Sequence, residues 1–255
     1  MDHEKIKQEF LRIKKLEFIP NIKADLNDGG AGNTFEHHLG VKENNSRDAD
    51  FDQFEVKTKK YLKGKSPISL FTQRPSSNYD DNYMRDNWGV ADKRYPNINR
   101  FSTSIYANRW SLVYKKHYMK IEVDRNNQRV YLVRADLEFN VIDRNVYWSF
   151  SDIQKGSTKL KNMFLVGVEV KNINDKEHYH FTDATVFTDY LGDQNFIDLI
   201  EQGVVRYDNR IGVYGPTTKP ANKIGTSHNH GGGFRVPKNH IEKLYKTKIE
   251  IPKDL

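Results

Sequence analysis

The chain has 255 residues, enough to bury a substantial core in one large domain or in two lobes that share one. With 36% hydrophobic, 29% charged and 12% aromatic residues, the composition excludes a disordered chain. The absence of cysteine excludes disulfide bonds and thiolate zinc sites, and it favours a cytosolic protein. The net charge of +7 permits a polyanionic partner such as nucleic acid, but charge alone does not demonstrate one.

The first forty residues are predicted to contain two helices. Residues 3–17 place apolar side chains at helical spacing, with Lys and Glu between them. After the turn-rich loop 27–34, a short helix is predicted through the segment FEHHLG, with Asn33 or Thr34 as its N-cap and Gly40 at its end.

Strands are predicted to dominate the middle of the chain. Residues 54–59 alternate apolar and polar side chains with the period of two that is typical of a strand, and a second strand bounded by prolines is predicted at 67–75. The segment 76–100 is rich in Asn, Asp, Tyr and Pro, and we expect a long excursion there. From 101 to 150 the pattern is β, with a hairpin that turns around 125–127.

Helices and strands are both predicted in the last hundred residues. A helix is predicted near 151–161, a buried strand at 162–171, and a second helix within 193–203 with Gly203 after it. The last part of the chain is expected to form short strands and loops, and to close with a helix near 238–246. The whole pattern predicts a mixed α/β (α+β) fold with a sheet at its centre.

A membrane span and a secretory signal are both unexpected. The longest apolar runs have only a few residues, such as MFLVGVEV at 163–170, whereas a spanning helix needs about 20. The first residues, MDHEKIKQEF, are charged and lack the apolar stretch of a signal peptide. We therefore expect a cytoplasmic protein without a membrane partner.

The segment DADFDQFEVKTKK, residues 48–60, carries the strongest chemical pattern. Glu55 and Lys57 leave the predicted strand on the same side, and Asp50 enters just before it. Hydrolysis of a phosphodiester needs an activated water, neutralisation of charge on phosphorus and a stabilised leaving oxygen, and Mg²⁺ held by hard oxygen ligands supplies much of this. The two carboxylates and the peptide carbonyl between Glu55 and Lys57 offer such oxygens, while the Lys57 ammonium can hold or help activate the water and offset phosphate charge.

Alone, this pattern is weak evidence, because E-x-K tripeptides are common on solvated strand faces. An Asp, a gap and then Glu-x-Lys on a strand is nevertheless the signature of the PD-(D/E)XK nuclease superfamily, and several separated segments add to it. These are GAGNTFEHHLGVKENN (30–45), SPISLFTQRP (66–75), DRNVYWSF (143–150), DATVFTDY (183–190), RIGVYG (210–215) and GTSHNHGGGFRV (225–236). In this order, over about residues 28–75 and 143–236, the chain resembles the MvaI/BcnI family of type II restriction endonucleases, which is related to the mismatch-repair nicking enzyme MutH.

The resemblance implies catalytic roles for four residues. Asp50 and Glu55 match the family's metal carboxylates, Lys57 matches its lysine, and Glu36 matches a helical Glu that helps to place a metal, a water or Lys57. One or two Mg²⁺ ions per active site are implied, with Mn²⁺ as a substitute. Two structural alternatives remain for Glu36, an exposed helix residue or a support for a cap at Thr34.

The resemblance also implies a fold. It is a PD-(D/E)XK core with a central mixed sheet flanked by helices, in two lobes around a DNA cleft. Residues 1–142 are expected to form mainly the catalytic lobe and residues 143–255 mainly the DNA-recognition lobe. The boundary is approximate, and the lobes can interleave.

Sequence recognition is assigned by the same resemblance to residues near the C-terminus. Guanine accepts hydrogen bonds from Arg in the major groove, and cytosine donates one to Asp or Glu. The matching residues lie at the base edges of short G/C-rich sites of the CC-N-GG type, and they are Asp208, Arg210, His228, His230 and Arg235. The alternatives are surface ion pairs for the Arg and Asp residues, and zinc binding by the two histidines, for which no further ligand is evident. The tripeptide HNH at 228–230 is not the dispersed HNH nuclease motif.

A lysine-rich run, KTKKYLKGK at 57–65, follows the catalytic pattern. Lys59, Lys60, Lys63 and Lys65 are expected either to contact phosphates or to solvate a loop. Phosphate contacts strengthen binding without specifying sequence.

Three functions are compatible with these observations. The first is a prokaryotic, cytoplasmic type II restriction endonuclease, a Mg²⁺-dependent monomer that cuts double-stranded DNA one strand at a time and has a DNA methyltransferase of the same system as its functional partner. The second is a MutH-like strand-specific nicking endonuclease. The third is a catalytically silent DNA-binding protein, against which the four intact catalytic side chains argue.

Overall fold

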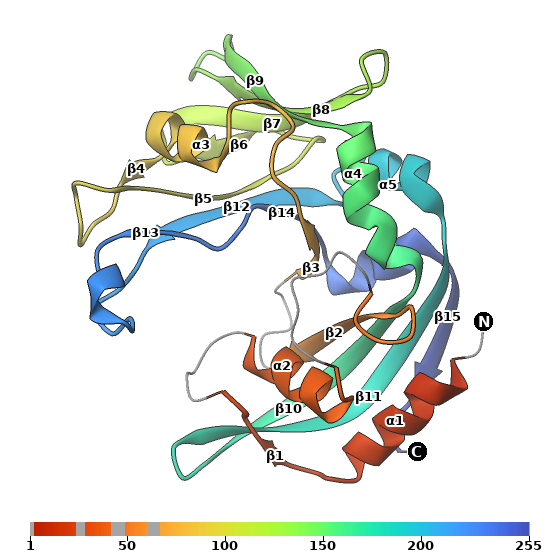
Figure 1. The fold of residues 1–255 in the computed structure, drawn as a ribbon. Helices are drawn as coiled ribbons and strands as arrows, with labels where there is room; N and C mark the ends of the chain where they lie inside the picture. Colours follow the sequence, from red (N-terminus) through yellow and green to blue (C-terminus); the bar gives the residue numbers. More distant parts are fainter. Residues whose placement is uncertain (1–2, 24–28, 42–48, 61–66, 255) are drawn as a thin grey trace. The chain divides into compact units, whose positions relative to one another are not determined.

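The computed structural model describes residues 3–23, 29–41, 49–60 and 67–254 (Figure 1). The chain divides into two compact units, each built from segments that are far apart in the sequence. Unit 1 comprises residues 1–68, 157–192 and 237–255, and unit 2 comprises residues 69–156 and 193–236. Residue 142, near which an approximate boundary was expected, lies inside strand β9 (Val141–Ser149) of unit 2.

A five-stranded mixed sheet forms the centre of unit 1. Its strand order is β1-β11-β10-β2, with β15 also paired to β11; β10 and β2 run parallel, and the other pairs are antiparallel. The strands are β1 (Ile19–Pro20), β2 (Glu55–Lys60), β10 (Met163–Ile173), β11 (Lys176–Tyr190) and β15 (Tyr245–Ile251). The predicted mixed class with a central sheet is thereby confirmed.

Two helices, α1 (Glu4–Lys14) and α2 (Gly30–His38), lie against one face of this sheet (Figure 1). The predicted periodicity of α1 is confirmed, because its apolar residues are buried in the core between helix and sheet. The Phe10 ring lies 5.8 Å from the ring of Phe164 on β10. The Phe35 ring of α2 lies 4.8 Å from that of Phe181 on β11. Val56 of β2 joins the same core, so the polar residues on either side of it face away from the helices.

Helix α2 begins earlier than predicted. Its N-cap is Gly29, without a side-chain cap, so the expected capping by Asn33 or Thr34 is wrong. Thr34 is buried within the helix, and its hydroxyl donates to the Gly30 carbonyl at 2.8 Å. Gly30 is suited to this start, because a Cβ there would lie 2.5 Å from the Tyr179 hydroxyl. The sequence pattern missed the first turn of α2 because that turn consists of small residues, which do not produce a helical repeat of apolar side chains.

The opposite face of the sheet is polar along β2 and lies beside two short 3-10 helices, η2 (Thr158–Lys161) and η4 (Lys238–Leu244). The helix expected near 238–246 is present as the 3-10 helix η4, but it does not close the chain, because strand β15 follows it. In β15 the side chains alternate between more buried and exposed positions. This alternation matches the period of a strand and is incompatible with a helical stripe.

Unit 2 contains two further sheets. One has the order β3-β14-β12-β5-β4, with β13 also paired to β12, and the other has the order β6-β7-β8-β9. The remaining strands are β3 (Ile68–Thr72), β4 (Val90–Ala91), β5 (Asn99–Ile105), β6 (Ser111–Val113), β7 (His117–Asp124), β8 (Arg129–Ala135), β12 (Arg206–Val213), β13 (Ser227–Asn229) and β14 (Gly233–Val236). The predicted hairpin around 125–127 is confirmed as the β7–β8 pair.

The helices of unit 2 are α3 (Asp81–Trp88), α4 (Phe150–Ser157), α5 (Gly192–Glu201) and the 3-10 helix η3 (Ala221–Lys223). Both α4 and α5 were predicted. Helix α3 was not, and it corrects the expectation of a long excursion over 76–100. The Asp80 side chain caps it by accepting from the backbone N–H groups of Asn82 at 2.9 Å and Tyr83 at 3.1 Å.

None of the helices in the described ranges is long and apolar enough to cross a bilayer.

His117 on β7 provides a pH-dependent test of this fold. It is only 3% exposed, and burial, followed by Arg134 and Lys116, lowers its pKa to about 4. The unfolded chain binds this proton near pH 6.5 and the folded chain only near pH 4, so stability falls as pH drops between these values. Urea unfolding at pH 7.5 and pH 4.5 measures this effect. We expect the His117 contribution to lower the free energy of unfolding by about 3 kcal/mol between these pH values, and we expect the His117→Phe variant to depend less on pH. The exposed His37→Phe is the control, and identical pH slopes for wild type and His117→Phe would contradict the account.

Candidate active site

A tight turn before β2 brings Asp50 alongside the strand. Phe51 and Phe54 exchange two backbone hydrogen bonds of 3.0 and 2.7 Å, and the two residues between them have positive φ angles of 44° and 74°. This is the backbone pattern of a two-residue hairpin. The chain therefore doubles back, and Asp50 Oδ2 accepts from the Val56 N–H at 2.9 Å.

The Val56 carbonyl faces the same edge of the sheet as Asp50. The Glu55 N–H donates to the Asn162 carbonyl on the β10 side, so the next N–H, that of Val56, points to the other edge. The N–H and C=O of one strand residue point to the same neighbour. Asp50 and the Val56 carbonyl thus lie together at the outer edge of β2.

Glu55 is the most deeply buried charged group of this region, with 0% exposure. Its Oε1 accepts from the ammonium of Lys57, and the ammonium of Lys159 lies 2.8 Å from the same oxygen. Its Oε2 is buried and has no hydrogen-bond partner among the described residues. One carboxylate oxygen is thus held by two cations while the other is left with its lone pairs unused.

These oxygens fit a hard divalent cation. Within the described ranges, no group of three or more His, Cys, Asp or Glu side chains gathers where it could hold a metal ion. Mg²⁺, however, is usually bound through one or two carboxylates, with water and substrate phosphate completing an octahedron. The unused Glu55 Oε2, the Asp50 carboxylate and the Val56 carbonyl are a donor set of that kind.

Lys159 was missed by sequence reasoning. It comes from η2, more than 100 residues after Glu55, and nothing in the spacing of the motif points to it. It reaches Glu55 because β10, which follows η2 directly, runs parallel to β2 with Met163 opposite Glu55. The signal was a lysine just before the strand that pairs with β2, and only knowledge of that pairing could reveal it.

Glu36 approaches β2 from the side of the helices. A Cβ on Gly32 would lie 3.6 Å from the Thr58 hydroxyl and 3.8 Å from Glu36 Oε1, so the two side chains flank the same point. Thr58 follows Lys57 and therefore points to the opposite face of the strand. Glu36 Oε1 and the Thr58 hydroxyl therefore lie near the same point, on the side of β2 that the helices cover.

The lysines after Lys57 are engaged with the protein. Lys59 is buried, with 7% exposure, and burial together with Lys238 lowers its pKa. Lys60 points to the other face, where its ammonium lies 2.8 Å from Glu177 Oε2 and 5.0 Å from the centre of the Tyr179 ring. Lys63 and Lys65 lie outside the described residues.

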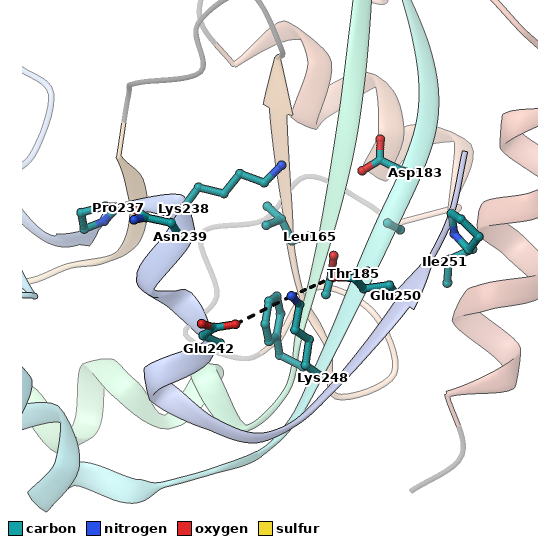
Figure 2. Close-up of a pocket in the computed structure, with 13 residues that line it drawn as sticks. Leu165, Asp183, Thr185, Pro237, Lys238, Asn239, Glu242, Lys248, Glu250 and Ile251 are labelled. Atoms are coloured by element: carbon teal, nitrogen blue, oxygen red, sulfur yellow. Dashed lines mark ion pairs between the residues drawn. The ribbon is translucent and has the colours of Figure 1, made fainter. Parts of the chain in front are cut away.

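A pocket of about 700 Å³ opens on the sheet face that carries Glu55 and Lys57 (Figure 2). Leu165, one of its lining residues, lies directly opposite Lys57 in the β10–β2 pair. Lys238 of η4 and Asp183 of β11 also line it, and burial raises the pKa of Asp183 against the opposing effect of Lys238. The pocket therefore continues sideways from the sheet face that carries Glu55 and Lys57.

The predicted recognition residues form two neighbouring groups in unit 2. In the first, Asp208 is 5% exposed and accepts from Arg206 Nη2 at 3.1 Å, while Arg235 Nη1 lies 3.4 Å from the same oxygen. Arg206 and Arg235 lie opposite each other in the β12–β14 pair. Burial, followed by the nearby Arg210, lowers the pKa of Arg235. Asp208 thus holds two guanidinium groups side by side.

The second group is the loop between β13 and β14. Arg210 Nη2 donates to the His230 carbonyl at 3.1 Å and lies 3.4 Å from the Gly231 carbonyl, while the His230 N–H donates to the Arg210 carbonyl at 3.0 Å. The His228 ring lies between two others, with its centroid 3.9 Å from the Tyr214 ring and 3.7 Å from the His230 ring. Burial and Lys223 lower the pKa of His228. Three rings therefore lie in contact here, the first two stacked and the third tilted by 41°, beside a loop backbone that Arg210 holds.

Glycine is required in this loop. A Cβ at position 232 would lie 1.8 Å from the hydroxyl of the fully buried Tyr207. Gly231 has a φ of 76°, in the left-handed region that favours glycine. The three glycines therefore let the backbone pass directly over the core of unit 2.

Known proteins resemble the chain over nearly its whole length. A family model described as the MvaI/BcnI restriction endonuclease family matches residues 7–245. Among solved structures, the chain is similar to restriction endonuclease MvaI in complex with its cognate DNA substrate, with 28% identity, 98% of this chain and 99% of that chain covered, and a TM-score of 0.87. It is also similar to restriction endonuclease MvaI in the absence of DNA, with 26% identity, 98% of each chain covered and a TM-score of 0.58. No curated protein sequence matches the chain.

The contribution of Lys159 to the site can be measured as stability. Lys159→Met keeps the apolar stem but removes one of the two cations on the buried Glu55, so we expect a loss on the order of 1–3 kcal/mol in urea unfolding. Lys253→Met is the matched control, because its ion pair with Glu169 is exposed and such pairs contribute about 0–1 kcal/mol. If both variants lose the same stability, Lys159 does not support the Glu55 carboxylate.

Proposed function

Because the chain belongs to the MvaI/BcnI restriction endonuclease family and is accordingly a site-specific DNA nuclease, we propose that it is a Mg²⁺-dependent enzyme for a short G/C-rich site. In this proposal it hydrolyses double-stranded DNA at a site of the CC-N-GG type, one strand at a time. The observation that carries the proposal is the buried Glu55 carboxylate beside Asp50 at the edge of β2, with Oε1 bound by two lysines and Oε2 without a hydrogen-bond partner among the residues the structure describes.

Asp50, Glu55 and the Val56 carbonyl would hold one or two Mg²⁺ ions, for which Mn²⁺ would substitute. When bound, the ion supplies positive charge to the reacting phosphate and lowers the pKa of a coordinated water. The turn at 51–54 keeps Asp50 at the strand edge, so Asp50 and Glu55 would both be available to hold the ion.

Lys57 is proposed to act on the attacking water. Its ammonium contacts Glu55 Oε1 and leaves the strand on the same side, so it lies where a water between the carboxylate and a phosphate would be held. Lys159 shares that oxygen, and its charge balances the buried carboxylate when Lys57 turns to the water or the phosphate. Glu36 is proposed to steady β2 from behind, next to Thr58, and so to place Lys57 indirectly.

Unit 1 is proposed to be the catalytic lobe and unit 2 the DNA-recognition lobe. The solved relative MvaI was captured with its cognate DNA, and we extend DNA recognition to this chain. Arg235, oriented by Asp208, is suited to the two acceptors of guanine, since an oriented guanidinium donates through two parallel bonds. Arg210, His228 and His230 are proposed to complete this base-reading surface, and Lys59 and Lys60 to contribute positive charge towards phosphates.

The chain is proposed to act as a cytoplasmic monomer in a prokaryotic restriction system. A single active site on a monomer would nick one strand and rebind to cut the other. A DNA methyltransferase of the same system would be its functional partner and would protect the host's own sites.

Plasmid digestion tests the proposed function directly. Purified protein with Mg²⁺ is expected to cut a sequenced plasmid into discrete fragments whose ends share one G/C-rich sequence, with nicked circles as an intermediate. Lys57→Ala should lower the cleavage rate by at least about 100-fold while Ca²⁺-supported DNA binding changes only a few-fold, because the lysine acts on the reaction and not on the fold.

Each other outcome points to a different conclusion. Nicked circles that are never linearised would indicate a strand-specific nickase, and binding without cleavage would indicate a silent DNA-binding protein. If Lys57→Ala abolishes binding as well, the residue is structural.

A pair of variants separates base reading from phosphate contact. Arg235→Ala should weaken binding to the cognate duplex by about 5- to 150-fold, the range of one bidentate base contact, and should change binding to a random duplex much less. If the Lys60 ammonium leaves Glu177 for a phosphate when DNA binds, Lys60→Ala should weaken both duplexes by similar factors and reduce the salt dependence. Filter binding with Ca²⁺ at two salt concentrations measures both, and equal weakening of both duplexes by Arg235→Ala would move Arg235 to the phosphate-contact class.

A further inference from the structure

Helix α3 is anchored firmly in unit 2. Its Met84 and Trp88 are buried one turn apart, and the Trp88 ring lies 6.0 Å from that of Phe101 on β5. Asp143 of β9 accepts on one oxygen from the Tyr83 hydroxyl at 2.6 Å and from Trp88 Nε1 at 3.0 Å. With its first turn capped, this short helix is held from its core side by both packing and hydrogen bonds.

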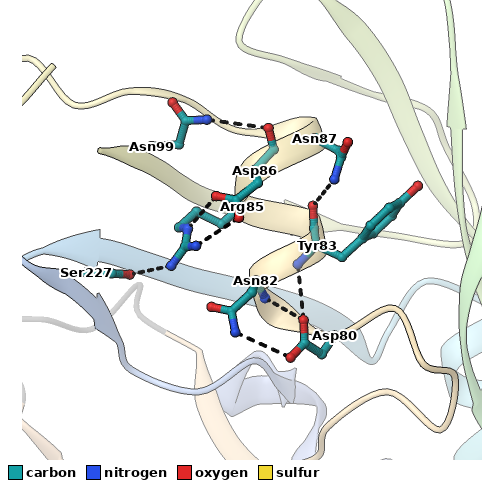
Figure 3. Close-up of polar contacts among 8 residues, drawn as sticks. All are labelled: Asp80, Asn82, Tyr83, Arg85, Asp86, Asn87, Asn99 and Ser227. Carbon is teal, nitrogen blue, oxygen red and sulfur yellow. Dashed lines mark hydrogen bonds and ion pairs between the residues drawn. The ribbon is translucent and has the colours of Figure 1, made fainter. Parts of the chain in front are cut away.

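The side of α3 next to this packed face contacts the edge strand β13. Asp81 and Arg85 are four residues apart and therefore share one helix face. Asp81 Oδ2 accepts from Asn229 Nδ2 at 2.7 Å, and Arg85 Nη1 donates to the Ser227 hydroxyl at 3.1 Å. Figure 3 shows that Asp86 holds the Arg85 guanidinium through bonds of 2.7 and 2.9 Å while it points to Ser227. These two contacts bracket His228, one residue on each side.

Asn229 connects α3 to the loop that contains Gly231–Gly233. Its amide nitrogen donates to Asp81, and its amide oxygen accepts from the Gly231 N–H at 2.8 Å. Both functional groups of one side chain are thus used, and the backbone from 229 to 231 is fixed relative to α3. His230 lies inside this closed turn, and its ring lies 3.7 Å from that of His228, tilted by 41°.

We propose that α3 is a brace that sets the orientation of the two histidines, and that Asp81, Arg85, Ser227 and Asn229 are positioning residues for sequence recognition. This inference rests on the proposed base-reading role of His228 and His230. None of the four residues needs to contact DNA. The brace contributes by fixing two rings on an edge strand that pairs with only one described neighbour, β12. Preorganisation of this kind lowers the entropic cost of binding a defined base sequence.

Charge at the Asp81–Asn229 contact gives the decisive experiment. Asn229→Asp replaces the donor to the buried Asp81 by a second carboxylate, so two like charges lie in contact and Asp81 loses its hydrogen bond, which is unfavourable. Adding Asp81→Asn restores the pair with donor and acceptor exchanged, and a carboxylate at position 229 can still accept from the Gly231 N–H. Asn87→Asp is the matched control, because it adds the same charge to α3 at a residue whose side chain donates to the Tyr83 carbonyl of its own helix.

Two readouts are needed. The first is discrimination, the ratio of Kd values for a one-base-altered duplex and the cognate duplex defined by plasmid digestion, measured with Ca²⁺. Asn229→Asp should reduce it by at least about tenfold, the double variant should return it to within about threefold of wild type, and the control should leave it unchanged. The second is the imidazole NMR signals of His228 and His230 without DNA, which should shift in Asn229→Asp and return in the double variant.

The outcomes are distinguishable. Unchanged discrimination and unchanged imidazole signals in Asn229→Asp, with folding intact by circular dichroism, would overturn the brace. A folded double variant that does not recover either readout would do the same. A wild-type protein with no preference among duplexes would overturn the proposed function instead, and the NMR readout would still test the brace.

Discussion

The proposed chemistry depends on one buried carboxylate and the two lysines that neutralise it. An ionised carboxylate with no exposure is tolerated only when cations and hydrogen bonds compensate for lost water. Lys57 and Lys159 both contact Oε1 of Glu55, so charge compensation is concentrated on one oxygen and the other keeps its lone pairs. The arrangement that makes burial tolerable is also the one that leaves a ligand for a metal. Asp50, held by the Val56 N–H, adds its oxygens at the same strand edge.

Buried carboxylates have a comparable positioning role in unit 2. Asp208 orients Arg206 and Arg235, Asp143 fixes Tyr83 and Trp88 of α3, and Asp81 binds Asn229 beside the histidine loop. Long or edge-located side chains lose much entropy when they bind a fixed target, and these contacts remove part of that loss before binding. In both units, buried carboxylates orient the donor groups around them. We propose that this arrangement supports the reaction in unit 1 and positions the DNA-reading side chains in unit 2.

Much of the fold followed from apolar periodicity, and the failures have identifiable causes. Helix α1, the β7–β8 hairpin and the buried β10 were predictable because their apolar residues repeat with the period of the element. The start of α2 was predicted wrongly because Gly30 packs directly against the Tyr179 hydroxyl, a distant contact that no local sequence pattern reveals. Helix α3 was missed because a helix of eight residues buries only a few apolar side chains, too few for a clear repeat. Its polar residues contact β13. Lys159 was missed because strand pairing, not spacing, brings it to Glu55.

The amino-acid sequence by itself determined the chemical inventory: an acid, an edge strand with Glu-x-Lys, and a C-terminal set of arginines and histidines in family order. These are local patterns, and the period of two on a strand is enough to place Glu55 and Lys57 on one face. Only the tertiary structure decided that Glu36 lies beside Thr58, that Arg235 joins Arg206 at Asp208, and that a helix from residues 81–88 contacts the histidine loop. The reason is physical: these relations join segments 20 to 150 residues apart through burial and hydrogen bonds, and no local periodicity encodes such partners.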